Sequence, residues 1–595
     1  MPPIIDRPVL DPPILDPRDG DIEDDASSTK RRSMLSLAGT LLAEISLPKL
    51  VLTWMLLIGF PFLLLGAAPL LVSMWIVSVS SKAGSVLTEL WPALLLGPLV
   101  ALGWIGGRRL LRLAESSFWS LNALAVQPAY SMFREGLRHL ADRLLPDIGE
   151  AGRARVRAGT AAAAGIAIFA LGLGIIALAW PATRWTGSLA DLSAPFRLLP
   201  FVAANSIVLV FAYFSVFALV WGLADTTMAQ PRDLKTFANP STAGRRWRVA
   251  HLSDIHTVGE PYGFRVESGR SGACGNGRFR QALVRLEEIH AVQKLDVILI
   301  TGDLTDAGRS AEWAEFFGAL ATHPTLAGLV VALPGNHDVN VVDRASPARL
   351  ELPGSPMKRL RQMRTLSALE ALQGSRLRIV DAQAGRLGVT LSEALRPHAA
   401  DMAAFADTGS SALSRSLTGL WERVFPLVLP PETDAGLGIL ALNSNAETHF
   451  SFTNALGLVS ADQARALRIA TEQYPHASWI IALHHHVIEY PQPAHALSER
   501  IGTALVNGSW FIRGLQRLAG RAILMHGHRH VDWIGQCGGL PILSAPSPVM
   551  DAADCAETYF YVHTMIIGPD SRLSLLEPER VAVAGNPAVR TAVMA

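Results

Sequence analysis

Long apolar runs occupy the first part of the chain, and shorter apolar runs separated by polar segments occupy the rest. The long runs lie at residues 50–79, 88–107, 160–180 and 199–223. Each is about as long as the ~20 residues that a helix needs to cross a lipid bilayer. Residues 48–225 are therefore predicted to form a membrane domain with about four transmembrane helices. A soluble bundle of buried helices is the alternative, and runs this long and nearly uncharged disfavour it.

Basic residues predict the orientation of these helices. Residues 108–158 contain nine arginines, whereas the segment between the third and fourth runs contains only Arg184 and Arg197. The positive-inside rule places the arginine-rich loop in the cytoplasm, together with the second half of the chain. The Pro- and Asp-rich residues 1–47 are expected to be a disordered cytoplasmic tail. We therefore expect a multi-pass protein of a bacterial inner or plasma membrane.

Within the arginine-rich loop, Phe133, Leu137, Leu140 and Leu144 recur at helical spacing, with arginines between them. This pattern fits a basic helix that lies on an anionic lipid surface. It fits equally well a helical extension that packs against neighbouring helices. No predicted span contains the cluster of ionisable residues that marks an ion pathway, so the membrane half is expected to be an anchor rather than a transporter.

After a predicted linker at residues 226–245, the pattern changes to short apolar runs with helical patterns between them. The runs typical of buried strands are 248–253, 296–301, 329–333, 437–442, 479–483 and 522–525. The helical patterns between the early runs lie at 280–293 and 311–322. The predicted fold class is an α-helical transmembrane region followed by an α/β domain, a layered β-sandwich flanked by helices, at residues 246–575. Residues 576–595 are expected to be a tail.

Five motifs rich in Asp, Asn and His follow five of these predicted strands. They are Asp254-Ile255-His256, Gly302-Asp303-Leu304-Thr305-Asp306, Gly335-Asn336-His337-Asp338, His484-His485-His486 and Gly527-His528-Arg529-His530. Singly, each is most simply a turn, cap or surface residue. Together, beyond the carboxyl ends of strands, they predict one site. Mixed carboxylate, amide and imidazole ligands suit Mn, Fe, Zn, Co or Ni ions better than Ca²⁺.

On these motifs, residues 246–575 resemble the calcineurin-like metallophosphoesterase superfamily. The resemblance implies two divalent metal ions, with a hydroxide between them that attacks phosphorus. It implies that one ion is held by Asp254, His256, Asp303 and His530. It implies that Asp303 also bridges to a second ion held by Asn336, His484 and His528. Among the three consecutive histidines, His484 is preferred because it directly follows the predicted strand, and His485 is the alternative.

Two further residues are candidates for the catalytic chemistry. His337 is placed by its motif to stabilise the phosphoryl oxygens and to protonate the leaving group. Asp338 is expected to orient His337 and the neighbouring ligands, and Asp306 is expected to act in the same way.

An insertion at residues 340–436 is the best candidate for a cap that selects the substrate. It contains the basic stretch 357–361 and ends with the apolar stretch 420–429. Trp421 and Phe425 in that stretch are expected to pack on the domain; the alternative is that they dip into lipid headgroups and favour a lipid-linked substrate. The polar segment 259–278 and the asparagines Asn276, Asn443 and Asn445 are weaker candidates for contacts with the phosphate.

Composition limits the classes of partner that we expect. The net charge of +1 disfavours a nucleic-acid partner, and the three cysteines are widely separated, which disfavours a disulfide framework. The leading hypothesis is a membrane-anchored phosphohydrolase of phosphodiester or pyrophosphate bonds, with membrane lipids and a lipid-linked or nucleotide phosphoester as partners. The alternatives are a cyclic-nucleotide phosphodiesterase, or a membrane sensor or partner-binding protein with a phosphoesterase output domain.

Overall fold

The structure is a computed structural model that divides into two compact units at Met228 and Ala229. It describes residues 47–88, 122, 126–145, 148–239, 244–260, 276–342, 349–352, 355–449, 451–491, 503, 505–550, 557–568 and 571–583. We call the part before this junction the helical unit and the part after it the sheet unit. Each is described by itself.

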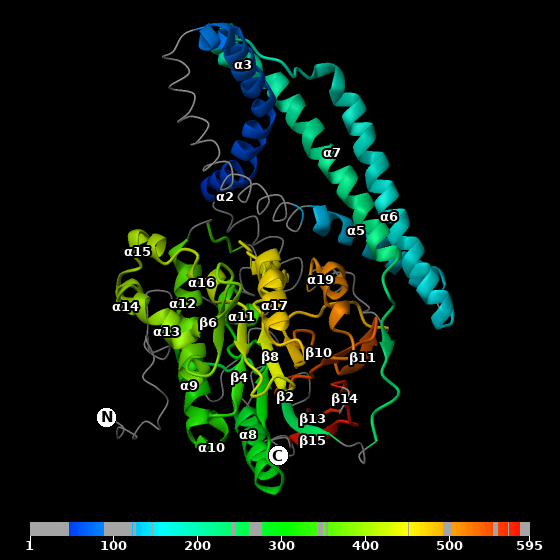
Figure 1. The fold of residues 1–595 in the computed structure, drawn as a ribbon, viewed down its shortest axis with the longest axis vertical. Helices are drawn as coiled ribbons and strands as arrows, with labels where there is room; N and C mark the ends of the chain where they lie inside the picture. The colour runs from blue at the N-terminus through cyan, green and yellow to red at the C-terminus, as the bar shows by residue number, and fades with distance from the viewer. Residues whose placement is uncertain are drawn as a thin grey trace, which may run out of the picture. The chain divides into compact units, whose positions relative to one another are not determined.

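The helical unit consists of long apolar helices (Figure 1). They are α2 (Leu47–Trp54), continued by a π-helical turn (Met55–Gly59), α3 (Phe60–Thr88), α5 (Gln127–Leu144), α6 (Glu150–Ala179) and α7 (Leu199–Thr226). Among the described residues, three segments are able by length and composition to cross a membrane, namely 60–77, 152–182 and 195–226. They confirm helices at the first, third and fourth predicted runs. The second run, 88–107, lies outside the described residues except for its first residue, and the count of four and the cytoplasmic orientation stay predictions.

Small residues let α6 and α7 approach each other closely. A Cβ atom on Gly222 would lie 3.1 Å from the Cα atom of Gly165 and 3.0 Å from the carbonyl oxygen of Ala161. Helix α7 also contacts α3, where the side-chain amide of Asn205 donates a hydrogen bond to the carbonyl of Gly66 at 3.2 Å. Close packing through small residues is typical of helices that associate within a membrane, where the lipid supplies no hydrophobic drive between them.

The sheet unit is a layered α/β domain with two mixed sheets (Figure 1). The nine-stranded sheet has the order β1 (Arg232–Asp233), β11 (Trp533–Cys537), β12 (Leu540–Ser544), β10 (Ala522–His526), β9 (Ser478–Ala482), β8 (Leu437–Ala441), β7 (Leu427–Leu429), β5 (Arg378–Asp381) and β6 (Arg386–Thr390). The six-stranded sheet has the order β14 (Leu573–Leu575), β13 (Thr558–Ile567), β2 (Arg245–Leu252), β3 (Val297–Ile300) and β4 (Val330–Ala332), and β15 (Glu579–Val583) pairs with β13. Strand β1 lies within the segment that the sequence suggests as a linker.

One hydrophobic core joins the two sheets. It includes Val249 and Leu299 of the six-stranded sheet and Ile480 and Ile523 of the nine-stranded sheet. The helices around the sheets are α8 (Gly277–Val292), α9 (Ser310–Ala321), α10 (Pro324–Ala327), α11 (Asn336–Val339), α12 (Pro356–Gln373), α13 (Leu391–Leu395), α14 (Ala399–Thr408), α15 (Ser411–Ser416), α16 (Leu420–Val424), α17 (Ala461–Gln473) and α19 (Gly508–Leu515). The predicted layered α/β class is therefore confirmed, as are all six predicted strands and both predicted helices.

The predicted insertion is part of this fold. Its strands β5, β6 and β7 extend the nine-stranded sheet, and α12 packs on β4. Trp421 and Phe425 are buried in the core, at 4% and 5% exposure. Packing on the domain is therefore confirmed for these two side chains, and the idea that they dip into lipid headgroups is wrong, because side chains already enclosed by protein have no surface to offer to lipid.

Candidate metal centre

The five motifs lie where strands of both sheets end. β2, β3 and β4 are parallel neighbours, and Asp254, Asp303 and Asn336 follow them within a few residues. β9 and β10 are also parallel neighbours, and His484 and His528 come two residues after them. The carboxyl ends of parallel strands share one edge of a sheet, so each sheet delivers its polar side chains to the same end.

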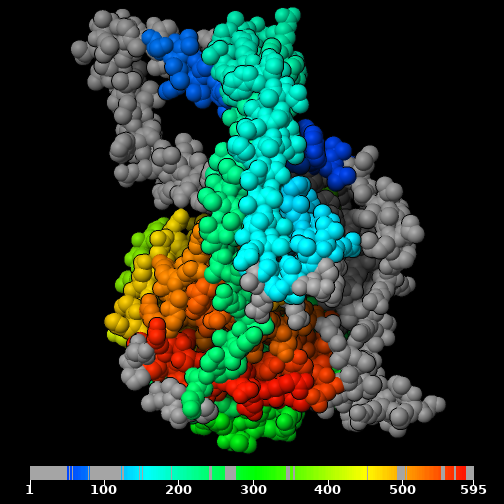
Figure 2. Space-filling view, turned by 90° about the vertical axis from the view of Figure 1, so that its right-hand side faces the viewer, coloured from blue at the N-terminus to red at the C-terminus, as the bar shows by residue number. Residues whose placement is uncertain are grey.

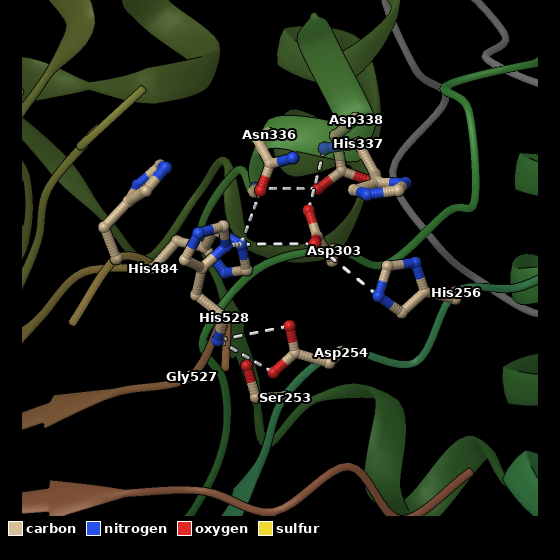
Figure 3. Close-up of polar contacts among 12 residues, drawn as sticks. Ser253, Asp254, His256, Asp303, Asn336, His337, Asp338, His484, Gly527 and His528 are labelled. Atoms are coloured by element: carbon tan, nitrogen blue, oxygen red, sulfur yellow. Dashed lines mark hydrogen bonds and ion pairs between the residues drawn. The ribbon is translucent and has the colours of Figure 1, made fainter. Parts of the chain in front are cut away.

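Direct hydrogen bonds hold these two strand edges together. The Nδ1–H group of His484 donates to the carbonyl of Thr301 at 2.8 Å. The backbone N–H of His528 donates to both carboxylate oxygens of Asp254, at 3.0 Å and 3.2 Å (Figure 3). Residues more than a hundred positions apart in the chain therefore meet in a fixed geometry.

Ligand atoms gather in three groups among the described residues. In each group, one candidate atom from every member lies within 4.8 Å of the others. The groups are Asp254 with His256 and His530, Asp303 with His484 and His528, and His256 with Asp306 and His337. The first group holds three of the four residues predicted for one ion, without Asp303. The second holds three of the four predicted for the other ion, without Asn336, which offers an amide.

Asp303 stands between the first two groups. Its Oδ2 atom lies 3.6 Å from Nε2 of His256 and 3.2 Å from Nε2 of His484 (Figure 3). Its Oδ1 atom accepts a hydrogen bond from the backbone N–H of His337 at 2.8 Å. One carboxylate oxygen therefore faces imidazoles of both groups, which is the placement that a ligand shared by two ions requires.

Lone pairs converge around Nε2 of His484. Because Nδ1 of this ring donates to a carbonyl, the neutral ring presents a lone pair at Nε2. Asn336 Oδ1 and His528 Nδ1 each lie 3.0 Å from this atom. In addition, Nε2 of His528 is buried without a hydrogen-bond partner. Electron-rich atoms that face one another and buried atoms left unsatisfied both fit a cation-binding site.

The electrostatics of the site point the same way. Burial would raise the pKa of Asp303, but the imidazoles of His484 and His337 hold it well below its usual value. Burial would lower the pKa of His484, but the Asp303 carboxylate raises it above its usual value. Burial, with His485 and His484 nearby, lowers the pKa of His528 well below its usual value. An ionised Asp303 and a neutral His528 are the protonation states that metal binding needs, whereas the raised pKa of His484 means that a metal ion competes with a proton for this ring.

Most of the candidate ligands have a strained backbone. The residues with a positive φ are Asp254 (56°), His256 (47°), Asp303 (50°), His528 (76°) and His530 (53°). Side chains other than glycine pay a steric cost in this region, and such residues cluster at functional sites. Among the described residues, Ser571 is the one other non-glycine with a positive φ.

Glycines before the ligands allow the loops to approach. A Cβ atom on Gly335 would lie 2.0 Å from Oδ1 of Asp303, which is far inside a van der Waals contact. Gly302 has a φ of +97° and a Cβ there would lie 2.5 Å from Nδ1 of His484. Glycine at both positions is therefore a condition for the ligand geometry.

His337, Asp306 and Asp338 surround the site without entering the second group. Nδ1 of His337 donates to the carbonyl of Asp306 at 2.7 Å, whereas the carboxylate of Asp306 lies 3.3 Å from Nδ1 of His256. The Asp338 carboxylate accepts hydrogen bonds from the backbone N–H groups of Thr305 and Gly335, at 2.9 Å and 2.8 Å. Burial and the nearby Asp303 raise the pKa of Asp338 to about 6. Asp338 therefore acts by positioning the two loops that carry Asp303 and Asn336.

The other histidines of the triple motif have different surroundings. Nδ1 of His485 lies 2.9 Å from the Ser444 hydroxyl, which also accepts hydrogen bonds from the backbone N–H groups of His484 and His485. His485 is not in any of the three ligand groups. The structure therefore places His484 with Asp303 and His528, as the strand boundary suggests.

The asparagines proposed to reach the phosphate are engaged elsewhere. Asn276 bonds both backbone groups of Val258, at 3.0 Å and 2.8 Å. Asn445 donates to the carbonyl of Pro334 and to the side chain of Asn443, at 3.2 Å and 3.0 Å. These side chains brace the loops around the site instead of extending from them.

Sequence reasoning missed one ion pair beside the site. Nη1 of Arg529 lies 3.1 Å and 3.0 Å from the two carboxylate oxygens of Glu489, and both side chains are largely buried. Arg529 separates His528 from His530, and Glu489 lies in the loop that begins with His484. The pair therefore ties together two loops that carry candidate ligands. No local pattern signals it, because the partners are 40 residues apart.

One comparison with known proteins identifies a family for part of the chain. Residues 248–388 match the family model of the calcineurin-like phosphoesterases. The chain matches no curated protein sequence.

Similar solved structures include a putative 5'-nucleotidase from Staphylococcus aureus, with 13% identity and a TM-score of 0.29 over 58% of this chain and 55% of that one. A dimetal phosphatase from Danio rerio has 10% identity and a TM-score of 0.31 over 57% and 99%. The NAD nucleotidase of Haemophilus influenzae has 12% identity and a TM-score of 0.30 over 57% and 57%. The chain thus spans little more than half the length of the two nucleotidases. The match to the family model shows that residues 248–388, which include the motifs at Asp254, Asp303 and Asn336, belong to a calcineurin-like phosphoesterase domain.

Proposed function

We propose that this chain is a membrane-anchored, metal-dependent hydrolase that cleaves a phosphodiester or pyrophosphate bond. The observation that carries the proposal is the position of Asp303, whose Oδ2 atom faces His256 and His484 at 3.6 Å and 3.2 Å. A carboxylate shared between two groups of nitrogen and oxygen ligands is the arrangement that two-metal hydrolases use.

The residues present fit two ions. Asp254, His256 and His530 would hold one ion, Asn336, His484 and His528 would hold the other, and Asp303 would contribute to both. When bound, such ions supply a nucleophilic hydroxide at neutral pH and positive charge for the phosphoryl oxygens. These ligands suit Mn, Fe, Zn, Co or Ni ions.

His337 is proposed to handle the proton of the leaving group. Its Nδ1–H group is used by the carbonyl of Asp306 at 2.7 Å, so its Nε2 atom is the ring position at which a proton can be exchanged. The backbone N–H of His337 donates a hydrogen bond to the Asp303 carboxylate at 2.8 Å. These two contacts fix the ring beside the candidate ligands, which is the geometric condition for a general acid.

The charge around the site favours a diester over a monoester. A phosphodiester carries one negative charge, whereas a monoester carries up to two. The guanidinium of Arg529 is the cation that the motifs bring to the site, and Glu489 matches its charge at 3.0 Å. With this cation neutralised, a singly charged phosphoryl group is the better substrate.

The test uses the full-length protein in detergent, stripped of metal and reloaded with Mn²⁺. Bis(p-nitrophenyl) phosphate and p-nitrophenyl phosphate are the substrates, and Asp303→Asn is compared with Asp462→Asn, whose side chain is 78% exposed. We expect diester turnover that falls by about 10³-fold in Asp303→Asn, or ~4 kcal/mol in the barrier, and is unchanged in Asp462→Asn. The amount of bound metal, measured by mass spectrometry, should also fall in Asp303→Asn.

Absence of turnover in a folded protein with each of the five candidate metals would contradict the proposal. The substrate class is then resolved by comparing detergent with lipid vesicles. A lipid-linked substrate predicts that the vesicles change the rate, whereas a soluble cyclic nucleotide predicts the same rate in both.

A further inference from the structure

Helix α5 exposes apolar side chains and buries polar ones, which is the reverse of a helix on the surface of a water-soluble protein. Phe133, Leu140 and Leu144, which share one face at helical spacing, are 45%, 53% and 70% exposed. On the opposite face, Gln127 and Glu135 are buried. An amphipathic helix in water buries its apolar face and exposes its polar face, so α5 is not arranged for contact with water on its outer side.

Polar contacts hold this buried face against α7. Arg134 forms an ion pair with Asp225, and the Tyr130 hydroxyl donates a hydrogen bond to the same carboxylate at 3.1 Å. Glu135 lies between Arg134 and Arg138, with contacts of 2.9 Å and 2.7 Å. Four charged side chains and a phenol are thus paired within the helical unit, which fixes the direction in which the apolar face points.

The attachment point lies at the end of a candidate membrane span. Asp225 is next to the last residue of the span 195–226. Helix α5 also packs against α6, whose candidate span begins at Gly152 (Figure 2). The exposed apolar face of α5 therefore lies beside the ends of two candidate spans, where these helices would leave the bilayer.

The charge near this level is basic. The described residues 126–145 and 148–157 contain six arginines and three acidic residues. Of the acids, Glu135 is enclosed between arginines, whereas Arg143, Arg153 and Arg155 are exposed. Exposed leucines beside exposed arginines are the combination by which interfacial helices bind an anionic membrane surface.

We propose that α5 is an interfacial helix that inserts Phe133, Leu140 and Leu144 among the headgroups of an anionic leaflet, with Arg143, Arg153 and Arg155 contacting lipid phosphates. The inference rests on the proposed membrane anchoring by α6 and α7. A protein partner or a second copy would cover the same face, but the arginines and the continuity with two candidate spans favour anionic lipid.

The experiment places a fluorescent label at three single cysteines of the full-length chain. Cys274 and Cys555 are replaced by Ser, and Cys537 is left because it is buried. The positions are Leu140→Cys in α5, Leu171→Cys in α6 and Val292→Cys on the sheet unit, which are 53%, 64% and 90% exposed. Each protein is reconstituted in nanodiscs of phosphatidylcholine with or without phosphatidylglycerol, and spin-labelled lipids quench the label near the headgroups or deep in the chains.

We expect headgroup-level quenching at position 140, deep quenching at 171 and none at 292. Phosphatidylglycerol should increase quenching at 140 by about twofold or more, and the triple variant Arg143→Gln, Arg153→Gln, Arg155→Gln should remove that increase.

The outcomes separate the inference from the anchoring on which it rests. If 171 is not quenched, the anchoring itself fails and α5 fails with it. If 171 is quenched while 140 behaves like 292, the anchoring stands and the interfacial helix is overturned. Equal quenching at 140 with and without phosphatidylglycerol would remove the preference for anionic lipid. A label at 140 whose emission depends on the protein-to-lipid ratio would show contact between copies instead.

Discussion

The helical unit and the sheet unit expose opposite kinds of surface. Large apolar side chains with high exposure run from Val51 to Leu223 in the helical unit, and among the described residues of the sheet unit only Val284, Val292, Val389 and Val531 are comparable. Soluble proteins rarely expose contiguous apolar surface on this scale without a partner for it. The difference teaches that surroundings that suit one unit do not suit the other, and the exposed apolar surface of the helical unit supports the proposed membrane anchoring.

Buried charge differs between the units as well. In the helical unit, Asp225 is matched by Arg134, so the buried charges balance where they lie. In the sheet unit, Asp254 and Asp303 are buried, and the partners within 4.0 Å of their carboxylates include the imidazoles of His530, His256 and His484. Balanced burial stabilises an orientation, whereas unbalanced negative charge creates a place for cations.

The largest expected effect comes from breaking the unbalanced site. His530→Ala should remove one bound ion and His528→Ala the other, because each residue belongs to a different group. Either change should lower diester turnover by about 10³-fold. Metal content by mass spectrometry and turnover with Mn²⁺ are the measurements.

The control for these two variants is His476→Ala, an exposed histidine of the same unit. If both ligand variants kept two ions per chain, the assignment of the two groups to two ions would be wrong.

The opposite surfaces can be compared by placing one charge on each. Leu171→Asp puts a carboxylate inside α6, within the candidate span 152–182, and should cost about 3 kcal/mol of membrane insertion. Val292→Asp, on an exposed surface of the sheet unit, should change the stability by no more than about 0.5 kcal/mol. The fraction that stays in the membrane after alkaline extraction measures the first, and thermal unfolding measures the second. If Leu171→Asp left the membrane-retained fraction unchanged, the exposed face of α6 at this position would not lie in the bilayer.

The buried ion pair of the sheet unit should have a smaller effect, because it positions ligands without touching an ion. Glu489→Gln loosens the contact between Arg529 and the loop that begins with His484. Metal affinity should fall about 10–100-fold, as measured by calorimetry on the stripped protein. Arg529→Lys keeps the charge and should lose less than Glu489→Gln. An unchanged affinity in both would show that the loops are held by other contacts.

The smallest expected effect concerns a buried histidine that belongs to none of the three ligand groups. Burial lowers the pKa of His563 to about 3, below the ordinary value of 6.5, so the unfolded chain binds a proton that the folded protein excludes. The contribution of the neutral His563 to the free energy of unfolding is complete above pH 6.5, and it is lost as the pH falls toward 3. Between pH 6.5 and pH 5.5 the loss should be about 1 kcal/mol.

His563→Leu should therefore flatten the dependence of unfolding free energy on pH in this range, measured by urea titration. His476→Gln is the control for the loss of an exposed imidazole. A variant with the same slope as the original protein would contradict the contribution of His563.

Local features explain what could be predicted. Strands such as β3 and β9 are buried along their whole length, and their continuous apolar runs stand out in the sequence. The ligand motifs follow those strands directly, so their meeting at one end of the sheets could be inferred from parallel strand pairing. Strand β11 alternates between buried and half-buried residues and carries two polar or glycine positions, and it was not anticipated because such a short pattern resembles a loop.

The sequence by itself determined the division into a strongly apolar first part and a less apolar second part, the order of the buried strands and the set of candidate ligands. These depend on hydrophobicity and on neighbours along the chain. Only the tertiary structure decided that Asp303 stands between two ligand groups, that Glu489 pairs with Arg529, that Trp421 and Phe425 are enclosed in the core, and that α5 turns its apolar face outward. Each of these depends on contacts between residues distant in the chain, and such contacts follow from how the elements pack together rather than from any local pattern.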